Sequence, residues 1–467
     1  MDKTNLYLFR LCILFVILKL ISIFTTNFNL YGDEAQYWLW SKELSFGYYS
    51  KPPLLSWFIR LITSVFGDSF FVLKTIPVFT YCVTSYLIFI FVKKLYYDVP
   101  LALCCALTFF LLPAVSLSSF LLSTDIFLIL FWTGGLIQVL KIKENPSYFN
   151  FIILGLLLGI TFLAKYAAIY FIISLIFLFI IERNFRLIIL QSKLKLLLAL
   201  LVIILILLPN ILWNYQHGWL TVEHSVDNAS LDKIKINPIG FFEFLFSQIF
   251  MIGPVLFVGF LLCLYKRINF HTNERFLISF ALPALLIVLL ESFLVRAHGN
   301  WAAVSLVTLS VFFVNIVYRL NKRIIYYNNY INLLAGLVLF IAIGISFPLN
   351  VFNRIIGVND FVQYLDEKNQ SNINNIVVND RLLFANLSYA YQSKKINFYS
   401  PLSPDSKIGH HFQLTNALPV NFDDNFILIG NKNDIHYLKK YKKIKLIGSK
   451  AFPFTDRNIE IYEIIFD

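Results

Sequence analysis

The sequence has little charge. Asp, Glu, Lys and Arg make up 14% of its 467 residues, whereas soluble domains contain about 25%. Hydrophobic residues instead make up 58%, with 49 Phe, and apolar runs near the roughly 20 residues that cross a bilayer recur through the first three quarters of the chain. These runs lack the alternating pattern of barrel strands, so we expect an all-α polytopic membrane protein.

Several familiar sequence signals are also missing. The five cysteines lie in apolar segments, without a CxxC pair and without histidines at metal-binding spacing, so they indicate small core residues. Residues 350–467 show no Gly-rich phosphate loop and no nucleophile motif, and the chain shows no internal repeat. The net charge of +12 comes from basic residues scattered beside apolar runs, which favours orientation in a membrane over nucleic-acid binding.

Two domains are expected. Residues 1–349 form a transmembrane domain that begins with an uncleaved signal anchor and has about eleven spans. Lys and Arg are concentrated in alternate connections, so the positive-inside rule places the loop after the first span outside, with an interfacial helix at residues 57–66. Residues 350–467 form a small extracytoplasmic α/β domain, with β-like runs at residues 376–378, 426–429 and 459–465.

The unusual polar side chains gather at the predicted outer face. The stretch that is densest in polar and aromatic groups is YGDEAQYWLWSKELSFGYYSKPPLLSW, residues 31–57. The candidates are Asp33, Glu34, Tyr37, Tyr49 and Lys51 in this first loop, Asp125 in a tight turn, Lys165 at a helix end, His217, Glu223 and His224 in the second large loop, and Arg296, His298 and Trp301 in a short turn. We therefore expect an active site on the outer face, at the level of the lipid headgroups.

Each candidate group also has a purely structural interpretation. An acid such as Asp33 can deprotonate an acceptor hydroxyl or be a solvated loop residue. A lysine such as Lys51, held by the two prolines that follow it, can bind a lipid phosphate or extend along the membrane interface. Asp125 can cap a helix, the tryptophans around His217 are typical of an aromatic belt, and Glu223 beside His224 is a weak metal signal.

Six motifs in chain order make the sequence resemble the GT-C superfamily of membrane glycosyltransferases, in the group of protein O-mannosyltransferases and aminoarabinose lipid A transferases. The motifs are YGDEAQYWLW, GYYSKPPLLSWFIRL followed by FGDS, LSTDIFLILFW, LGITFLAKYAAIY, LLPNILWNYQHGW and a charged turn ending in NW. The resemblance covers roughly residues 25–320. The tail resembles no family that we can name.

The resemblance implies roles for individual residues. Asp33 matches the acidic catalytic residue, Asp125 a second active-site acid, and Lys51 a contact to the lipid phosphate. We add Glu34 to the catalytic candidates, Lys165 and Arg296 to the phosphate contacts, and Tyr37, Tyr49, His217, His298 and Trp301 to the substrate contacts. The aminoarabinose transferases have an acidic, metal-associated residue before the lysine, but this chain has Ser50. We therefore expect no required metal, although Glu223 and His224 leave a divalent metal open.

The expected function is an inverting glycosyltransferase of the bacterial inner membrane. It would move a sugar from a polyprenyl-phosphate donor to lipid A or another envelope acceptor on the periplasmic face, with membrane lipid but no nucleic acid among its partners. A protein Ser or Thr is the alternative acceptor. Two other functions remain open, a lipid flippase or transporter and a polysaccharide polymerase or ligase, although the sequence shows neither inverted repeats nor paired arginines in the outer loops.

Overall fold

The computed structural model describes residues 3–229, 235–265, 272–404, 406–438, 441–451 and 458–466. The chain divides into two compact units. The membrane unit comprises Met1–Thr25, Lys51–Leu55 and Leu73–Gly344, and the sheet unit comprises Thr26–Ser50, Ser56–Val72 and Ile345–Asp467. The sheet unit thus combines the tail with most of the first loop, and the expected domain boundary after residue 349 stays a prediction.

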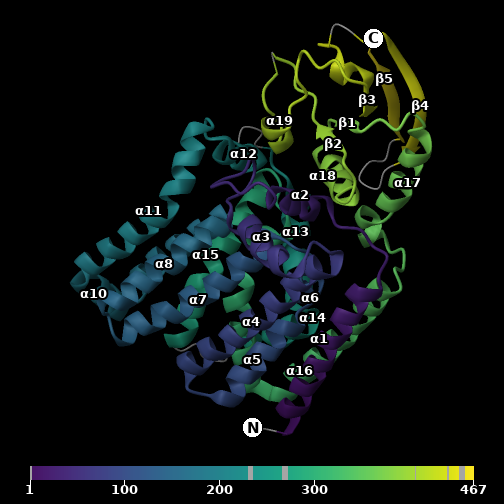
Figure 1. Ribbon diagram of the computed structural model, residues 1–467. Helices are drawn as coiled ribbons and strands as arrows, with labels where there is room; N and C mark the ends of the chain where they lie inside the picture. The colour runs from purple at the N-terminus through teal and green to yellow at the C-terminus, as the bar shows by residue number, and fades with distance from the viewer. Residues whose placement is uncertain are drawn as a thin grey trace. The chain divides into compact units, whose positions relative to one another are not determined.

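Helices make up the described part of the membrane unit (Figure 1). In chain order they are α1 (Lys3–Thr25), α4 (Phe70–Tyr96), α5 (Val99–Leu111), α6 (Pro113–Ser118), α7 (Thr124–Glu144), α8 (Tyr148–Ala164), η1 (Tyr166–Ala168), α9 (Ile169–Ile181), α10 (Arg183–Gln191), α11 (Lys193–Gln216), α12 (Leu220–Ala229), α13 (Pro238–Ile252), α14 (Pro254–Tyr265), α15 (Thr272–Leu294), η3 (Gly299–Ala302) and α16 (Ser305–Gly344). Helices suit a bilayer because they satisfy their own backbone hydrogen bonds.

Six helices in the described ranges are long and apolar enough to cross a membrane, or up to eight if each bent pair counts as one span. The bent pairs are α9 with α10, at 109°, and α13 with α14, at 100°. Helix α16 contains a break at Asn321, whose backbone is extended (φ −164°, ψ 106°). The prediction of an all-α polytopic membrane protein is confirmed, whereas the number of eleven spans stays a prediction.

Two glycines allow α8 to pack closely against α11. A Cβ atom on Gly155 would lie 2.5 Å from the carbonyl oxygen of Ala199, and one on Gly159 would lie 2.9 Å from Cβ of Ile206. The two glycines are four residues apart and therefore lie on one face of the helix, as small residues commonly do where membrane helices approach closely. This packing fixes the helix that ends immediately before Lys165.

The sheet unit contains a five-stranded sheet of order β2-β1-β3-β5-β4. Strands β2, β1 and β3 are parallel, and β3, β5 and β4 are antiparallel. The elements of the unit are α2 (Gly32–Trp40), most of α3 (Leu54–Phe66), η4 (Asn350–Ile355), α17 (Val358–Lys368), β1 (Asn375–Val378), α18 (Arg381–Ala390), β2 (Asn397–Tyr399), α19 (His411–Thr415), β3 (Phe426–Ile429), η5 (Lys432–Ile435), β4 (Lys443–Ala451) and β5 (Asn458–Ile465).

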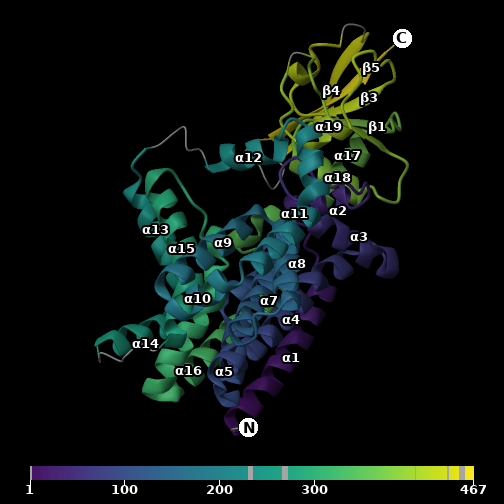
Figure 2. The same ribbon diagram turned by 90° about the vertical axis from the view of Figure 1, so that its left-hand side faces the viewer.

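Helices α2 and α18 lie side by side in both views (Figure 1 and Figure 2), and the contacts near their starts and near their ends show that they run in the same direction. Near their starts, a Cβ atom on Gly32 would lie only 2.8 Å from Cβ of Leu382. Near their ends, the rings of Trp38 and Tyr389 meet edge to face with centroids 4.8 Å apart. Gly32 therefore permits the close approach of a first-loop helix to a helix of the tail.

Candidate active site

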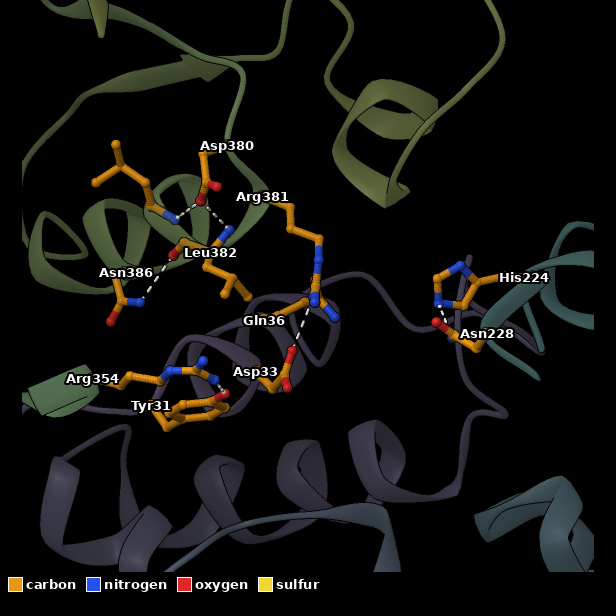
Figure 3. A network of polar contacts seen from close by, with 11 residues as sticks. Tyr31, Asp33, Gln36, His224, Asn228, Arg354, Asp380, Arg381, Leu382 and Asn386 are labelled. Atoms are coloured by element: carbon orange, nitrogen blue, oxygen red, sulfur yellow. Dashed lines mark hydrogen bonds and ion pairs between the residues drawn. The ribbon is translucent and has the colours of Figure 1, made fainter. Parts of the chain in front are cut away.

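Asp33 lies in the first turn of α2, where Arg381 contacts it. Oδ1 of Asp33 accepts a hydrogen bond from Nη1 of Arg381 at 2.9 Å, and the same Nη1 donates to Oε1 of Gln36 at 2.9 Å. Figure 3 shows the Arg381 side chain reaching from α18 to these two residues of α2. Within the described residues, Oδ2 of Asp33 has no hydrogen-bond partner. The carboxylate is thus fixed through one oxygen and open at the other.

Glu34, the neighbouring acid, has a structural role in the same turn. Its Oε2 accepts a hydrogen bond from the backbone N–H of Tyr31 at 2.7 Å, and its side chain is buried. This contact is the carboxylate half of a capping box, which satisfies a donor that the helix leaves unpaired. The two adjacent acids therefore have different surroundings.

Arg381 reaches this position because it opens a helix directly after a strand. Strand β1 ends at Val378, and Asp380 caps α18 by accepting from the backbone N–H groups of Leu382 and Leu383 at 2.9 and 2.8 Å. Strand β1 lies between β2 and β3, all three parallel. In α/β sheets, ligand sites lie beyond the carboxyl ends of parallel strands where the strand order reverses. Arg381 was not among the predicted site residues. The connection between β1 and α18, at the carboxyl end of a parallel strand, is the signal that could have identified it.

The membrane unit contains a second polar cluster, at the start of α7. Nζ of Lys165 donates to Oδ1 of Asp125 at 2.6 Å, and Nδ2 of Asn300 donates to Oδ2 at 3.1 Å. Lys165 lies in the break between α8 and η1, where its backbone is extended (φ −161°, ψ 136°). Ser123 occupies the N-cap position of α7 but makes no capping bond with its side chain. The cluster joins the LSTD, LAKY and NW motifs.

Two buried lysines hold the turn that precedes Asp125. Nζ of Lys19 donates to Oγ of Ser119 at 2.8 Å, and Nζ of Lys74 donates to the carbonyl oxygen of Phe120 at 3.0 Å. Both lysine side chains are fully buried. Charged groups inside a membrane protein are costly and therefore need such partners. Sequence reasoning missed both, because each lies alone within an apolar helix.

The other basic and histidine candidates lie at helix ends. Arg296 is exposed and has no ion pair within the described ranges, and the ring of His298 meets that of Trp301 at 5.5 Å. His217 ends α11, where its Nδ1 lies 2.8 Å from the carbonyl oxygen of Trp213 and its ring stacks on that indole. A local contact thus accounts for the orientation of His217.

The tyrosine candidates belong to the sheet unit. Tyr37 is buried against Trp40, with ring centroids 5.5 Å apart, and the hydroxyl of Tyr49 donates to the carbonyl oxygen of Ile408 at 3.3 Å. In the membrane unit, Lys51 is half-buried beside the buried Pro52. The roles of these residues in binding substrate stay predictions.

The pair Glu223 and His224 lies on α12, and Nε2 of His224 is 2.9 Å from Nδ2 of Asn228. Because neighbouring residues on a helix point in different directions, these two side chains do not converge. Across the described residues, no group of three His, Cys, Asp or Glu side chains is placed to hold a metal ion.

The structure thus contains two polar clusters, each built around a candidate acid, and among their contacts between described residues only that of Asp125 with Lys165 joins two of the predicted residues. In the sheet unit Arg381 donates to both Asp33 and Gln36, whereas in the membrane unit Asp125 accepts from Lys165 and Asn300. A common site that contains both groups stays a prediction.

Comparisons with known proteins agree on the class of the chain. Residues 50–213 match the family described as dolichyl-phosphate-mannose-protein mannosyltransferase. Lipid A galacturonosyltransferase RgtD of Rhizobium johnstonii is 28% identical over 293 residues, which cover 62% of this chain and 61% of that protein. The match thus spans about three fifths of the length of that relative.

Two solved structures have a similar fold along nearly the whole chain. Both are of ArnT from Cupriavidus metallidurans and are 11% identical to this chain over 98% of its length. The apo structure has a TM-score of 0.67 and covers 97% of that chain, and the structure bound to undecaprenyl phosphate has a TM-score of 0.71 and covers 98%. The resemblance inferred from the six motifs is confirmed, and the chain has the GT-C fold of the polytopic membrane glycosyltransferases.

Proposed function

We propose that this protein transfers a sugar from a polyprenyl-phosphate donor to the glycan part of lipid A. The observation that carries the proposal is the placement of Asp33, whose Oδ1 is fixed by Arg381 at 2.9 Å while Oδ2 has no partner in the described part of the chain. A carboxylate oriented in this way is suited to accept a proton from an acceptor hydroxyl. The likeness to RgtD, a lipid A galacturonosyltransferase, supports this choice of acceptor.

The reaction is a single displacement. The oxygen of an acceptor hydroxyl bonds to the anomeric carbon of the sugar while the bond from that carbon to the donor phosphate oxygen breaks. The hydroxyl proton passes to Oδ2 of Asp33, and the electron pair of the broken bond stays on the phosphate. Because the acceptor attacks opposite the departing phosphate, the configuration at the anomeric carbon inverts.

Cations in the membrane unit bind the donor phosphate in this account. Lys165 donates one N–H to Asp125, and its other two find no acceptor within the described residues. Asp125 and Asn300 therefore hold the lysine in place without using all of its donors. A preorganised ammonium stabilises the negative charge that grows on the leaving phosphate. Lys51, followed by two prolines, is the second phosphate contact, and Arg296 the third.

The proposed location is the bacterial inner membrane, with the site on the periplasmic face. The uneven distribution of Lys and Arg supports this orientation. A polyprenyl-linked donor presents its sugar at the membrane surface, which agrees with a chain that shows no nucleotide-binding motif. A protein Ser or Thr is the second candidate acceptor, because the matched family is described as a protein mannosyltransferase.

Two variants of the purified full chain test this division of roles. Asp33→Asn removes the base and should lower kcat by about 10²- to 10⁴-fold with little change in donor KM. Lys51→Ala removes a phosphate contact and should raise donor KM. Both quantities are measured as sugar transferred from a radiolabelled polyprenyl-phosphate donor to extracted lipid A. Normal turnover by the Asp33→Asn variant would refute the assignment of Asp33.

A further inference from the structure

The sheet unit contains a pocket that the proposed chemistry does not use. Its volume is about 420 Å³, and it is lined by the end of α2 together with α18, β2 and α19. Its lining includes Trp40, Ser388, Gln392, Asn397, Tyr399 and Asn416. Small-ligand pockets typically have volumes of about 300–1,000 Å³. The pocket is therefore large enough for a small organic ligand.

The pocket lies on the same helix faces as the Asp33–Arg381 pair. Trp40 follows Asp33 by seven residues on α2, and Ser388 follows Arg381 by seven residues on α18. Seven residues complete two helical turns, so each pair of positions lies on one face and is separated by about 10 Å along the axis. Because α2 and α18 run in the same direction, the pocket lies two turns beyond the open carboxylate. A ligand of two sugar rings bridges such a distance.

The lining combines aromatic rings with side-chain amides. The rings of Phe398 and Tyr399 are half-buried, and the amides of Gln392 and Asn397 are exposed. Sugar hydroxyls both donate and accept hydrogen bonds, as do Asn and Gln amides. The apolar C–H face of a sugar ring packs against an aromatic ring. The mixture of groups is thus suited to a saccharide.

The indole of Trp40 supplies a second observation. Trp40 is 2% exposed and lines the pocket. Its Nε1–H is buried and finds no acceptor in the described part of the chain. A buried donor left without a partner costs about 1–3 kcal/mol. Because Nε1 has almost no accessible surface, a ligand hydroxyl reaches it only after a shift of the side chains that cover it, and accepting this hydrogen bond would then remove that cost.

The charges around the pocket favour an uncharged sugar over a phosphate. Of the two lining lysines, Lys42 pairs with Asp68 at 2.6 Å and Lys394 pairs with Asp366 at 2.8 Å. Partial burial acts to raise the pKa of Asp68, but hydrogen bonds from Lys42 and Trp38 outweigh it and lower that pKa below its ordinary value. Both ammonium groups are therefore already neutralised by carboxylates of the protein.

We propose that this pocket binds an uncharged sugar ring of the acceptor glycan, two helical turns from the hydroxyl that Asp33 deprotonates. The inference rests on the proposed function, because it names the acceptor subsite of the same reaction. It assigns the tail a role in selecting the acceptor. In this proposal the cations of the membrane unit still bind the donor phosphate.

Binding of a soluble N-acetylglucosamine disaccharide, which is uncharged, to the full-length protein tests the proposal. The protein is held in a detergent without a sugar headgroup, because such a headgroup would compete for the pocket. Ser388→Trp fills the pocket from α18 and should weaken binding of the disaccharide by about tenfold or more, which is about 1.4 kcal/mol. The matched control is Ser393→Trp, an equal change at an exposed neighbour outside the pocket lining, and it should bind as the wild type does.

A second variant covers the case in which Ser388→Trp fails to fold. Asn416→Ala removes one amide, whose Oδ1 accepts from its neighbour Thr415, and should weaken binding by a few-fold. Undiminished binding in a folded variant of either kind would overturn the proposal. Binding of a Ser/Thr peptide in place of the disaccharide would also overturn it.

The binding experiment contains no donor, so it is independent of sugar transfer. If Asp33→Asn still transfers sugar, Asp33 is not the base. The binding data alone then decide whether the pocket binds a sugar. If binding of the disaccharide is absent in the wild type, the pocket is wrong while the transfer assay still decides the reaction.

Discussion

Asp33 and Asp125 both lie in the first turn of a helix, yet their surroundings differ. Asp33 is half-buried and has one open oxygen among the described residues, whereas Asp125 is buried and has contacts at both oxygens. The sequence identified both as candidates from their place at the predicted outer face. It did not distinguish them, because their partners are 40 to 348 residues away along the chain.

The contact from Arg381 should matter for turnover more than for stability. Both side chains of the pair are more than a third exposed, and exposed ion pairs contribute about 0–1 kcal/mol. Loss of the contact in Arg381→Ala frees the carboxylate to rotate, and misplacement of a catalytic group by about 1 Å can lower kcat by roughly 10²-fold. We expect a large loss of kcat with an almost unchanged melting temperature, measured by transfer assay and thermal unfolding.

Two further variants separate positioning from a general effect of charge. Arg381→Lys should recover part of kcat, because a lysine can pair with Asp33 but lacks the planar fork of the guanidinium. The matched control is Arg354→Ala in the same unit, which removes the contact from Nη1 to the hydroxyl of Tyr31 at 3.0 Å and should leave kcat unchanged. Wild-type turnover in Arg381→Ala would rule out the positioning role.

Lys165 should stabilise the fold through Asp125. Replacing it with Met leaves a buried carboxylate without its cation, a change that typically costs about 3–5 kcal/mol. The melting temperature of Lys165→Met should therefore fall, and the double variant Lys165→Met/Asp125→Leu should recover part of the loss. Lys141→Met, on the exposed surface near the end of α7, is the control. A double variant no more stable than the single one would argue against the buried pair.

At the scale of elements, the sequence predicted the strands that a run of hydrophobic residues marks. The β-like runs at residues 376–378, 426–429 and 459–465 coincide with β1, β3 and β5, which carry the buried residues of the sheet. Strand β4, KIKLIGSKA, was not predicted, because it is an edge strand with lysines and mostly exposed side chains. The short β2 and the helix α2 within the first loop were also missed. Packing against β1 and α18 specifies these elements more than their own pattern does.

Gly32 should be required for the packing of α2 against α18. In Gly32→Ala the new Cβ would lie 2.8 Å from Cβ of Leu382, and overpacking of this kind typically costs about 1–3 kcal/mol. Thermal unfolding of the full chain should show the loss, and Leu382→Gly in the same background, which removes the Cβ of residue 382, should restore part of it. Gly134→Ala is the control, because its nearest new contact is 3.4 Å. An unchanged melting temperature for Gly32→Ala would contradict this packing.

At the scale of the whole molecule, the two units hold different kinds of chemistry. The membrane unit places a half-buried lysine beside Asp125 and Asn300, and the sheet unit places an open carboxylate and an aromatic pocket along α2 and α18. Composition alone predicted a helical membrane protein, because apolar length is a strong signal. The second unit could not be predicted in full, since it joins residues 26–50 to a tail that begins at residue 345.

The most direct test of the central claim is mass spectrometry of lipid A. The lipid is extracted from a strain lacking the gene that carries either the wild-type protein or Asp33→Asn, with periplasmic proteins analysed in parallel. We predict that lipid A gains the mass of one sugar with the wild type, and that this mass is absent with Asp33→Asn. The same lipid A in both strains, or the added sugar on periplasmic proteins instead, would contradict the account.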